Sequence, residues 1–98
     1  MDKIYKALAE VNRRKIIFWL GLGELNVTEI VKKLDLSQAT ISNHLSILRK
    51  AALVTFKIKG KERIYKLNLE KADLFVKELN RLMPLRVKRL DDEIIIRR

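Results

Sequence analysis

Positions 26–50 predict two short helices joined by a tight turn, an arrangement that few small folds contain. Asn26 followed by Glu29 has the pattern of a capping box at a helix start. Apolar residues then recur at helical spacing, at Val27, Ile30, Val31 and Leu34. Asp35 tolerates the left-handed backbone that ends a helix, and Ser37 is a favourable cap for the next one. Because so few residues separate the two, the segment is predicted to be a helix-turn-helix.

The second of these helices, expected over 37–51, has an unusual polar face. Its apolar stripe must face the core and consists of Ile41, Leu45, Leu48 and Ala52. The other positions are rich in Ser, Thr and Asn, poor helix formers, where a solvated face normally carries Glu, Lys and Gln. Short neutral donors and acceptors suit base edges in a DNA major groove, and a solvated face of odd composition is the alternative. The DNA-binding residues expected here are Ser37, Gln38, Ala39, Thr40, Ser42, Asn43, His44, Ser46, Arg49 and Lys50.

A β-hairpin is predicted directly after this helix. Residues 54–59 alternate between apolar and polar side chains, Gly60 turns the chain, and 62–67 return as a second strand. From 37 to 66 the chain has seven Lys or Arg and one acid, so +6 of the net charge of +10 lies there. Charge concentrated beside a polar helix favours contact with DNA phosphates. The cations expected to point outward near the hairpin tip and contact DNA are Lys57, Lys59, Lys61 and Arg63.

The composition restricts the possible functions. Lys and Arg number 22 against 12 Asp and Glu, which favours a polyanionic partner, nucleic acid before membrane. No apolar run approaches the roughly 18 residues of a membrane span, and the first residues lack a signal peptide's apolar stretch, so a cytoplasmic location is expected. The absence of Cys excludes disulfides and thiolate metal sites. No nucleophile–base pair, phosphate loop or acidic cluster is visible, so neither enzyme activity nor a cofactor is expected.

Helices are also expected on the amino-terminal side of this unit. Residues 2–9 read as one helix, and a second begins at a cap on Asn12 and is stopped by Gly21 and Gly23. The run of cations at 13–15, Arg-Arg-Lys, is a candidate for phosphate contacts, and a solvated helix start is the alternative.

A long helix from about Glu70 carries an apolar stripe broader than a chain this small can easily bury. Together with the apolar face of residues 2–9 it predicts the seam of a homodimer. The residues expected in this seam are Ile4, Tyr5, Leu8, Leu74, Phe75, Leu79, Leu82 and Met83. Pro84 should kink or end the helix. The segment beyond it, which contains Ile94, Ile95 and Ile96, is either a second helical segment or a tail that covers the partner.

Three segments resemble the ArsR/SmtB family of winged-helix repressors: KALAEVNRRKIIFWL, ELNVTEIVKKLDLSQATISNHLSILRKAALV and KGKERIYKLN. The resemblance covers roughly positions 4–68, and its most specific parts are LSQATISNHLSILRKAALV and the G-K-x-x-x-Y pattern of the hairpin. It implies a homodimer that pairs through its first and last helices and represses operons by binding palindromic operators. It also implies a phosphate or base contact for His44, with packing or capping as the alternative.

Many members of that family release DNA when a metal binds, and here the sequence departs from the family pattern. The thiolate motif E-L-C-x-C falls on positions 24–28, with Asn26 and Thr28 where the two Cys would be. A second family site uses Asp, His and Glu pairs on the last helix, and positions 70–98 contain no His. A lone His44 does not supply the three or four ligands that zinc needs, so no metal is expected.

The sequence therefore predicts a mostly helical α+β fold, a winged helix-turn-helix with a two-stranded hairpin wing and a carboxy-terminal dimerisation helix. Residues 1–98 are expected to form a single domain, with a winged-helix core over 3–68 and the dimerisation helix and tail over 70–98. The expected function is that of a dimeric, sequence-specific regulator that binds double-stranded DNA, without metal or membrane. A winged-helix module for protein contact or for non-specific nucleic-acid architecture is the alternative.

Overall fold

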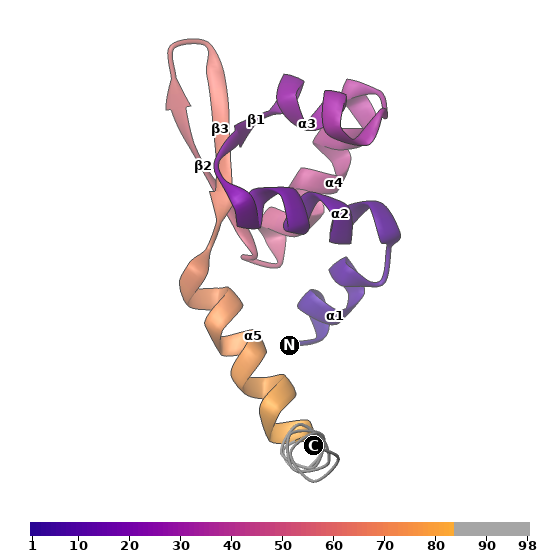
Figure 1. Ribbon diagram of the computed structural model, residues 1–98, viewed down its shortest axis with the longest axis vertical. Coiled ribbons are helices and arrows are strands. Elements are labelled where there is room, and N and C mark those ends of the chain that lie inside the picture. The colour runs from indigo at the N-terminus through magenta and orange to yellow at the C-terminus, as the bar shows by residue number, and fades with distance from the viewer. Residues whose placement is uncertain (84–98) are drawn as a thin grey trace, which may run out of the picture.

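The computed structural model describes residues 1–83, so the expectations for Pro84 and for the segment 85–98 lie outside the described residues. Figure 1 shows a group of helices with a β-hairpin rising beside it and the last helix extending away. In chain order the elements are α1 (Asp2–Leu8), α2 (Val11–Leu22), β1 (Leu25–Asn26), α3 (Val27–Leu34), α4 (Gln38–Lys50), β2 (Val54–Lys59), β3 (Glu62–Leu67) and α5 (Leu69–Leu82). No helix in this part of the chain has the length and apolar character needed to cross a bilayer.

The helix-turn-helix consists of α3 and α4, and the predicted caps are confirmed. Asn26 Oδ1 accepts a 2.8 Å hydrogen bond from the Glu29 amide, and Glu29 Oε1 accepts one of 2.9 Å from the Asn26 amide. Asp35 ends α3 with a φ of 55°. Ser37 Oγ accepts a 3.1 Å hydrogen bond from the Thr40 amide at the start of α4. Local capping interactions therefore set where α3 and α4 begin, and the left-handed backbone at Asp35 ends α3.

The start of α2 differs from the expectation. Its cap is Glu10 rather than Asn12, because the Glu10 carboxylate accepts hydrogen bonds from the amides of Asn12 (2.9 Å) and Arg13 (3.1 Å). At the other end Gly21 lies inside the helix, and Gly23 alone follows its last residue.

The hairpin has the predicted strands and turn, with Gly60 in the left-handed region at φ 63°. The sheet has a third strand that the sequence did not predict, since β1 pairs antiparallel with β3 and the strand order is β1-β3-β2. Because β1 has only two residues, it carries no alternation from which a strand could be inferred. The wing is therefore anchored to the strand that immediately precedes α3.

The core lies between the helices and the base of the sheet, and α4 supplies much of it. Its stripe is confirmed at Ile41, Leu45 and Leu48, each with no exposed surface. Ala52 does not extend the stripe, because it follows the helix at φ 62°, where its carbonyl accepts a hydrogen bond from Asn68 Nδ2. From α1, Ile4 is buried in this same core. This corrects its assignment to the dimer seam, because its side chain is already covered within the protomer.

Candidate nucleic-acid interface

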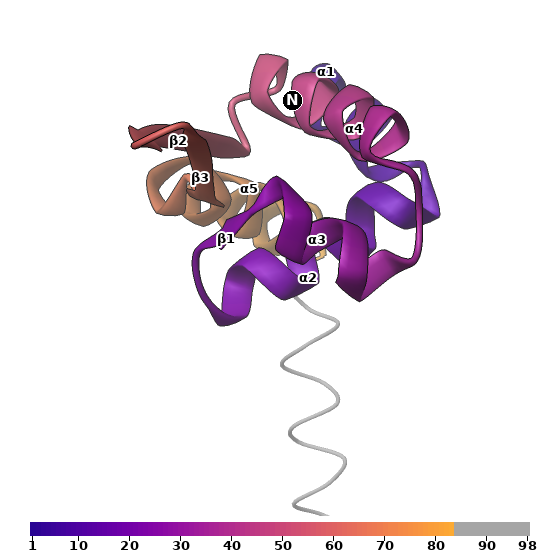
Figure 2. The same ribbon diagram turned by 90° about the horizontal axis from the view of Figure 1, so that it is seen from above.

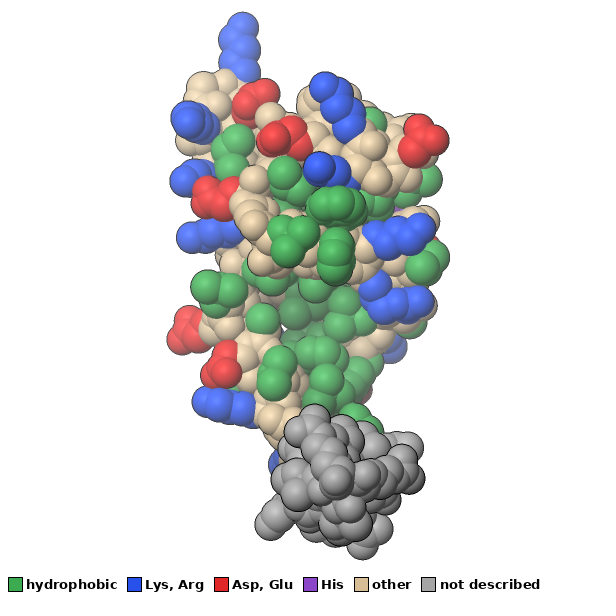
Figure 3. All heavy atoms as spheres, in the orientation of Figure 1, with side chains coloured by type: hydrophobic (Ala, Val, Ile, Leu, Met, Phe, Trp, Pro, Cys, Tyr) green, Lys and Arg blue, Asp and Glu red, His purple; other side chains and the backbone are tan. Residues whose placement is uncertain are grey.

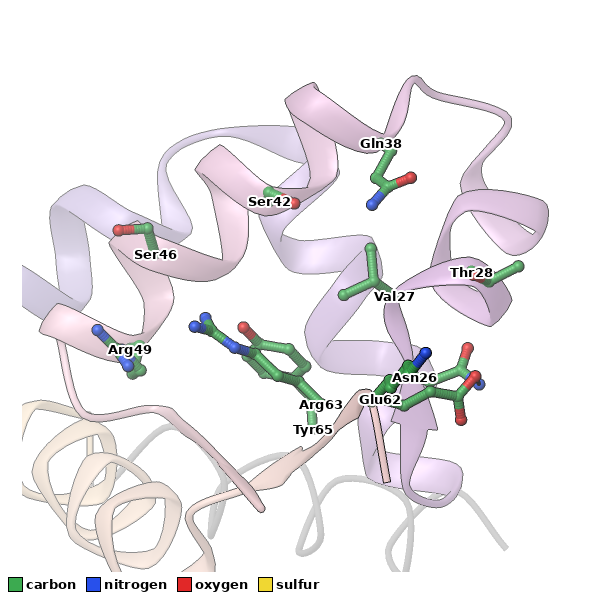
Figure 4. A pocket seen from close by; sticks show the side chains of 11 residues that line it. Asn26, Val27, Thr28, Gln38, Ser42, Ser46, Arg49, Glu62, Arg63 and Tyr65 are labelled. Atoms are coloured by element: carbon green, nitrogen blue, oxygen red, sulfur yellow. Dashed lines mark hydrogen bonds between the residues drawn. The ribbon is translucent and has the colours of Figure 1, made fainter. Parts of the chain in front are cut away.

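The surface of α4 that faces the wing forms one wall of a polar groove of about 390 Å³. Figure 4 shows its lining from α4 on successive turns of the helix, with Arg63 and Tyr65 of the hairpin across the groove. The helix contributes Gln38, Ser42, Ser46 and Arg49. The hairpin contributes Lys61, Glu62, Arg63 and Tyr65, and the start of α3 with the residue before it contributes Asn26, Val27 and Thr28. The groove thus gathers four of the predicted α4 residues and two of the predicted wing cations.

Two guanidinium groups in this groove lie against one aromatic ring. The Arg63 guanidinium carbon is 4.6 Å from the centroid of the Phe56 ring, and that of Arg49 is 5.2 Å from it. Neither guanidinium forms an ion pair with any residue in 1–83. Stacking restricts where each guanidinium can lie, so less rotamer entropy is lost when an anion binds. The arrangement suits a phosphate group that enters between α4 and the wing.

The other face of the hairpin has a different character. Across the hairpin Phe56 pairs with Tyr65 and Ile58 with Arg63, which places these four on the face toward α4. Lys57 and Lys59 alternate with them and lie on the opposite face. There the Lys57 ammonium is 3.2 Å from Glu24 Oε1. The wing cations predicted to contact DNA therefore differ in their surroundings: Arg63 lies on the face toward α4, and Lys57 is paired with an acid on the face away from α4.

The flank of α4 away from the wing holds His44, and the structure does not support its predicted contact with DNA. The His44 side chain is only 12% exposed, and its Nε2 lies 3.7 Å from Glu10 Oε2 at the start of α2. Its Nδ1 is buried and has no hydrogen-bond partner within the described residues. The packing alternative therefore describes this residue better. Its place beside the apolar stripe was visible in the sequence, but the proximity of Glu10 was not.

The cations at the start of α2 also have local partners. Arg13 Nε donates a 2.7 Å hydrogen bond to the Ala7 carbonyl, and Arg14 Nη1 donates one of 2.7 Å to the Leu8 carbonyl. Carbonyls in the last turn of a helix have no partner within the helix, so these two arginines complete the end of α1. The sequence did not predict these bonds, and contact of the 13–15 run with phosphate stays a prediction.

Between the two flanks, the outermost face of α4 is open to solvent. Ala39, Asn43 and Lys50 lie there, all exposed. At the start of the helix Ser37 and Thr40 are exposed as well, and the Ser37 hydroxyl donates a 2.8 Å hydrogen bond to Thr40 Oγ1 in addition to its capping role. The outermost face of α4 therefore contains one side chain with an amide, Asn43. The amide of Gln38 lines the adjoining groove.

A second surface, distinct from the α4 groove, is apolar. None of the residues of α5 is buried, although Phe75, Leu79 and Leu82 recur at helical spacing. The Tyr5 and Phe75 rings meet edge to face at 5.8 Å between centroids, so α1 and α5 adjoin. Figure 3 shows hydrophobic side chains gathered down the middle of this face, over α2 and between α1 and α5. The polar side of α5 includes Arg81, whose two 2.8 Å hydrogen bonds to Glu78 hold the pKa of that carboxyl below its ordinary value.

Helix α2 also carries exposed apolar side chains that the sequence did not single out. Phe18 is 60% exposed and Leu22 is 70% exposed, one turn apart on the same helix. Their i, i+4 spacing was the available signal, but the same spacing also fits a buried helix face.

Asn26 and Thr28, at the positions of the family's thiolate ligands, both line the groove, and the Asn26 side chain also makes two hydrogen bonds. Asn26 uses its Oδ1 to cap α3, and its Nδ2 donates a 3.3 Å hydrogen bond to Glu62 Oε1. Within residues 1–83, no three His, Cys, Asp or Glu side chains come close enough together to hold a metal ion.

The helix-turn-helix, the hairpin wing and the basic groove between them define a winged-helix DNA-binding protein. A profile described as "Bacterial regulatory protein, arsR family" matches residues 10–55. The transcriptional repressor SdpR of Bacillus subtilis is 34% identical over 68 residues, which are 69% of this chain and 76% of SdpR. The arsenical resistance operon repressor of Staphylococcus xylosus is 31% identical over 80 residues, 82% of this chain and 77% of that protein.

The chain belongs to the ArsR family of bacterial regulatory proteins. It is a DNA-binding transcription regulator and not an enzyme. The structure of HlyU from Vibrio cholerae N16961 superimposes with a TM-score of 0.66 at 34% identity, covering 83% of this chain and 88% of HlyU. The predicted fold and the resemblance to the family are therefore confirmed.

Proposed function

We propose that this protein is a homodimeric repressor that binds a palindromic operator through α4 and the wing. The observation that carries the proposal is the groove between α4 and β3, where two guanidiniums stacked on Phe56 adjoin an exposed helix face rich in short polar side chains. Arg49, Lys61 and Arg63 bind phosphates, which set the position of the helix but carry no sequence information. Gln38, Ser42 and Asn43 contact base edges in the major groove. SdpR and the Staphylococcus xylosus relative are both named as repressors, which favours repression.

The homodimer is proposed to form through α5 and the adjoining parts of α1 and α2. The support for this is that no residue of α5 is buried within residues 1–83, and a second copy supplies the same apolar surface in a closed two-fold arrangement. The proposal keeps Tyr5, Leu8 and the α5 residues in the seam and adds Phe18 and Leu22. In this arrangement 3–68 form the DNA-binding core, and 70–98 contain the dimerisation helix.

We further propose that the repressor acts in the cytoplasm and does not sense metal. The cytoplasmic location follows from the DNA target. The absence of metal sensing is supported by Asn26 and Thr28 at the positions of the family's thiolates and by the absence of Cys. The signal that would release the operator is therefore of another kind than metal coordination by thiolates.

The test is a selection of binding sites from random duplex DNA with the full chain. The expected result is an inverted repeat whose half-sites lie about one DNA turn apart, roughly 34–36 Å between centres, because two-fold symmetry sets the spacing. Footprinting should then show protection confined to that repeat. Enrichment of no sequence, with protection spread along the DNA, would instead support the alternative of non-specific nucleic-acid architecture.

A further inference from the structure

On the flank of α4 opposite the wing, a shallow depression of about 480 Å³ lies between α1 and α4. Its floor consists of small or apolar side chains, Ala7, Ile47 and Ala51. Its rim carries four cations, Lys3, Lys6, Arg13 and Lys50, and no acidic side chain lines it. This set of seven residues is called the α1–α4 patch below. None of its three lysines forms an ion pair with any residue in 1–83.

The α1–α4 patch and the wing groove bracket the exposed face of α4. Successive residues of a helix are about 100° apart, so Ile47 points to one flank while Ser46 and Arg49 point to the other. The groove contains Ser46 and Arg49, and the patch contains Ile47. In Figure 1, α4 passes between the hairpin at the upper left and α1 at the lower right. A partner that covers the outer face of α4 therefore meets cations on both sides.

A helix in the major groove of DNA lies between two rows of phosphates, since the groove is about 12 Å wide and a sugar-phosphate backbone runs along each edge. The wing groove supplies cations for one backbone. Of the residues predicted to bind DNA, Lys50 is the one cation on the side of the other backbone. We propose that the α1–α4 patch binds phosphates of the second backbone, so that Lys3 and Lys6 of α1 are DNA contacts. This inference rests on the proposed function and extends the binding surface to a helix otherwise assigned to dimerisation.

The local energetics of α1 favour an external anion at this place. Lys3 and Lys6 are three residues apart on α1, where like charges repel. A bound phosphate relieves this repulsion. The neighbouring side chains of the floor, Ala7 and Ala51, are short, so a backbone can approach the patch closely. The two functions of α1 do not compete, because Tyr5 packs on Phe75 of α5 while Lys3 and Lys6 border α4.

The experiment compares two double variants with the same change in net charge. Lys3→Gln with Lys6→Gln removes the patch cations of α1. The control, Lys66→Gln with Lys77→Gln, removes one lysine from the hairpin face away from α4 and one from α5, where Lys77 pairs with Asp73. Sedimentation of each variant first establishes that it has the same oligomeric state as the wild type. Affinity for operator and for scrambled duplex is then titrated over a range of salt concentrations.

The patch variant should lose about two units of the slope of log affinity against log salt, because each phosphate contact contributes roughly 0.9. Affinity should fall alike for both duplexes, and the control variant should keep the wild-type slope. In phosphate-ethylation interference, the patch variant should no longer be sensitive to certain phosphates on one DNA backbone. Arg63→Ala should lose its sensitivity to phosphates on the opposite backbone. Equal slopes in the two double variants, or loss of the same phosphates as in Arg63→Ala, would overturn the inference while leaving the proposed function intact. A wild-type protein that selects no sequence would instead overturn the proposed function.

Discussion

The helices α4 and α5 are similar in sequence pattern and opposite in how the chain uses them. Each has an apolar stripe, over 13 residues in α4 and 14 in α5. Within residues 1–83 the protomer buries the stripe of α4 completely, whereas no residue of α5 is buried and Phe75 is covered only in part. Their polar faces differ too: α5 carries ion pairs between Lys77 and Asp73 and between Arg81 and Glu78, whereas α4 carries Ser, Asn and Gln. The exposed side of each helix therefore indicates the kind of partner it suits. For α5 this is another apolar surface, and for α4 it is a surface that forms hydrogen bonds.

Breaking the apolar side of α5 should have the largest effect on DNA binding. Leu82→Asp places a charge in the proposed seam, where burial without a partner is costly, and should yield a monomer. A monomer contacts one half-site only, so operator affinity should approach that for scrambled duplex, a loss on the order of 10³ or more. Sedimentation and operator titration measure the two effects. Asn80→Asp, an exposed change on the same helix, is the matched control and should remain dimeric. A dimeric Leu82→Asp protein would show that α5 is not the seam.

The buried side of α4 should respond differently. Leu45→Ala removes a fully buried side chain from the core and should lower the free energy of unfolding by about 2–5 kcal/mol. Unlike the change in α5, this loss originates within one protomer, so it should be present in a Leu82→Asp background as well. Denaturant unfolding of both proteins measures it. If Leu45→Ala costs no stability once the dimer is broken, the core of α4 depends on the partner and the contrast between the two helices fails.

This contrast also separates what the sequence predicts from what it does not. The caps at Asn26 and Ser37 could be predicted because both partners lie within three residues. The apolar stripe of α4 could be predicted because its period is local. The roles of Lys57 and His44 could not, since each depends on an acid, Glu24 or Glu10, that only the tertiary fold brings close.

The same reasoning applies to the seam. The periodicity of α1 shows that Ile4, Tyr5 and Leu8 share a face, but not which of them the protomer already covers. Packing buries Ile4 and leaves Tyr5 partly exposed against Phe75. The exposure of Phe18 and Leu22 could not be predicted either, because no pattern within α2 shows which of its apolar side chains the rest of the protomer leaves uncovered.

The polar side of α4 should determine sequence specificity. Asn43 lies on the outermost face, and a good bidentate contact between Asn and adenine discriminates by about 1–3 kcal/mol. Asn43→Ala should therefore weaken operator binding by roughly ten-fold or more, as that range implies. Affinity for scrambled duplex should barely change, because the Lys and Arg contacts remain. The two titrations are made at one salt concentration. Equal losses on both duplexes, or none, would show that Asn43 does not contact bases.

The two faces of the wing allow a smaller and more selective test. Arg63→Ala removes a guanidinium that lies in the groove against Phe56, whereas Lys57→Ala removes an ammonium paired with Glu24 on the opposite face. The first should lower the salt slope of binding by about one unit, and the second should leave it unchanged, although both remove one charge. The comparison of the two slopes is itself the control for net charge. If Lys57→Ala lowers the slope as much as Arg63→Ala, both faces of the hairpin contact phosphates.

The smallest effect is expected from metals. Asn26 and Thr28 occupy the positions of the family's thiolates, and Asn26 is already engaged at both ends of its amide, by the Glu29 amide and by Glu62. His44 lies against Glu10 with no other imidazole or thiol in residues 1–83, and zinc needs three or four protein ligands. Zinc, cadmium or arsenite at micromolar concentration should therefore leave operator affinity within the error of a chelator-controlled titration. Asn26→Ala should instead weaken the cap of α3, by about 0.5–2 kcal/mol of stability, whether or not metal is present. A metal-dependent loss of operator binding would contradict this account. If Asn26→Ala abolished that loss, the metal site would lie at the start of α3.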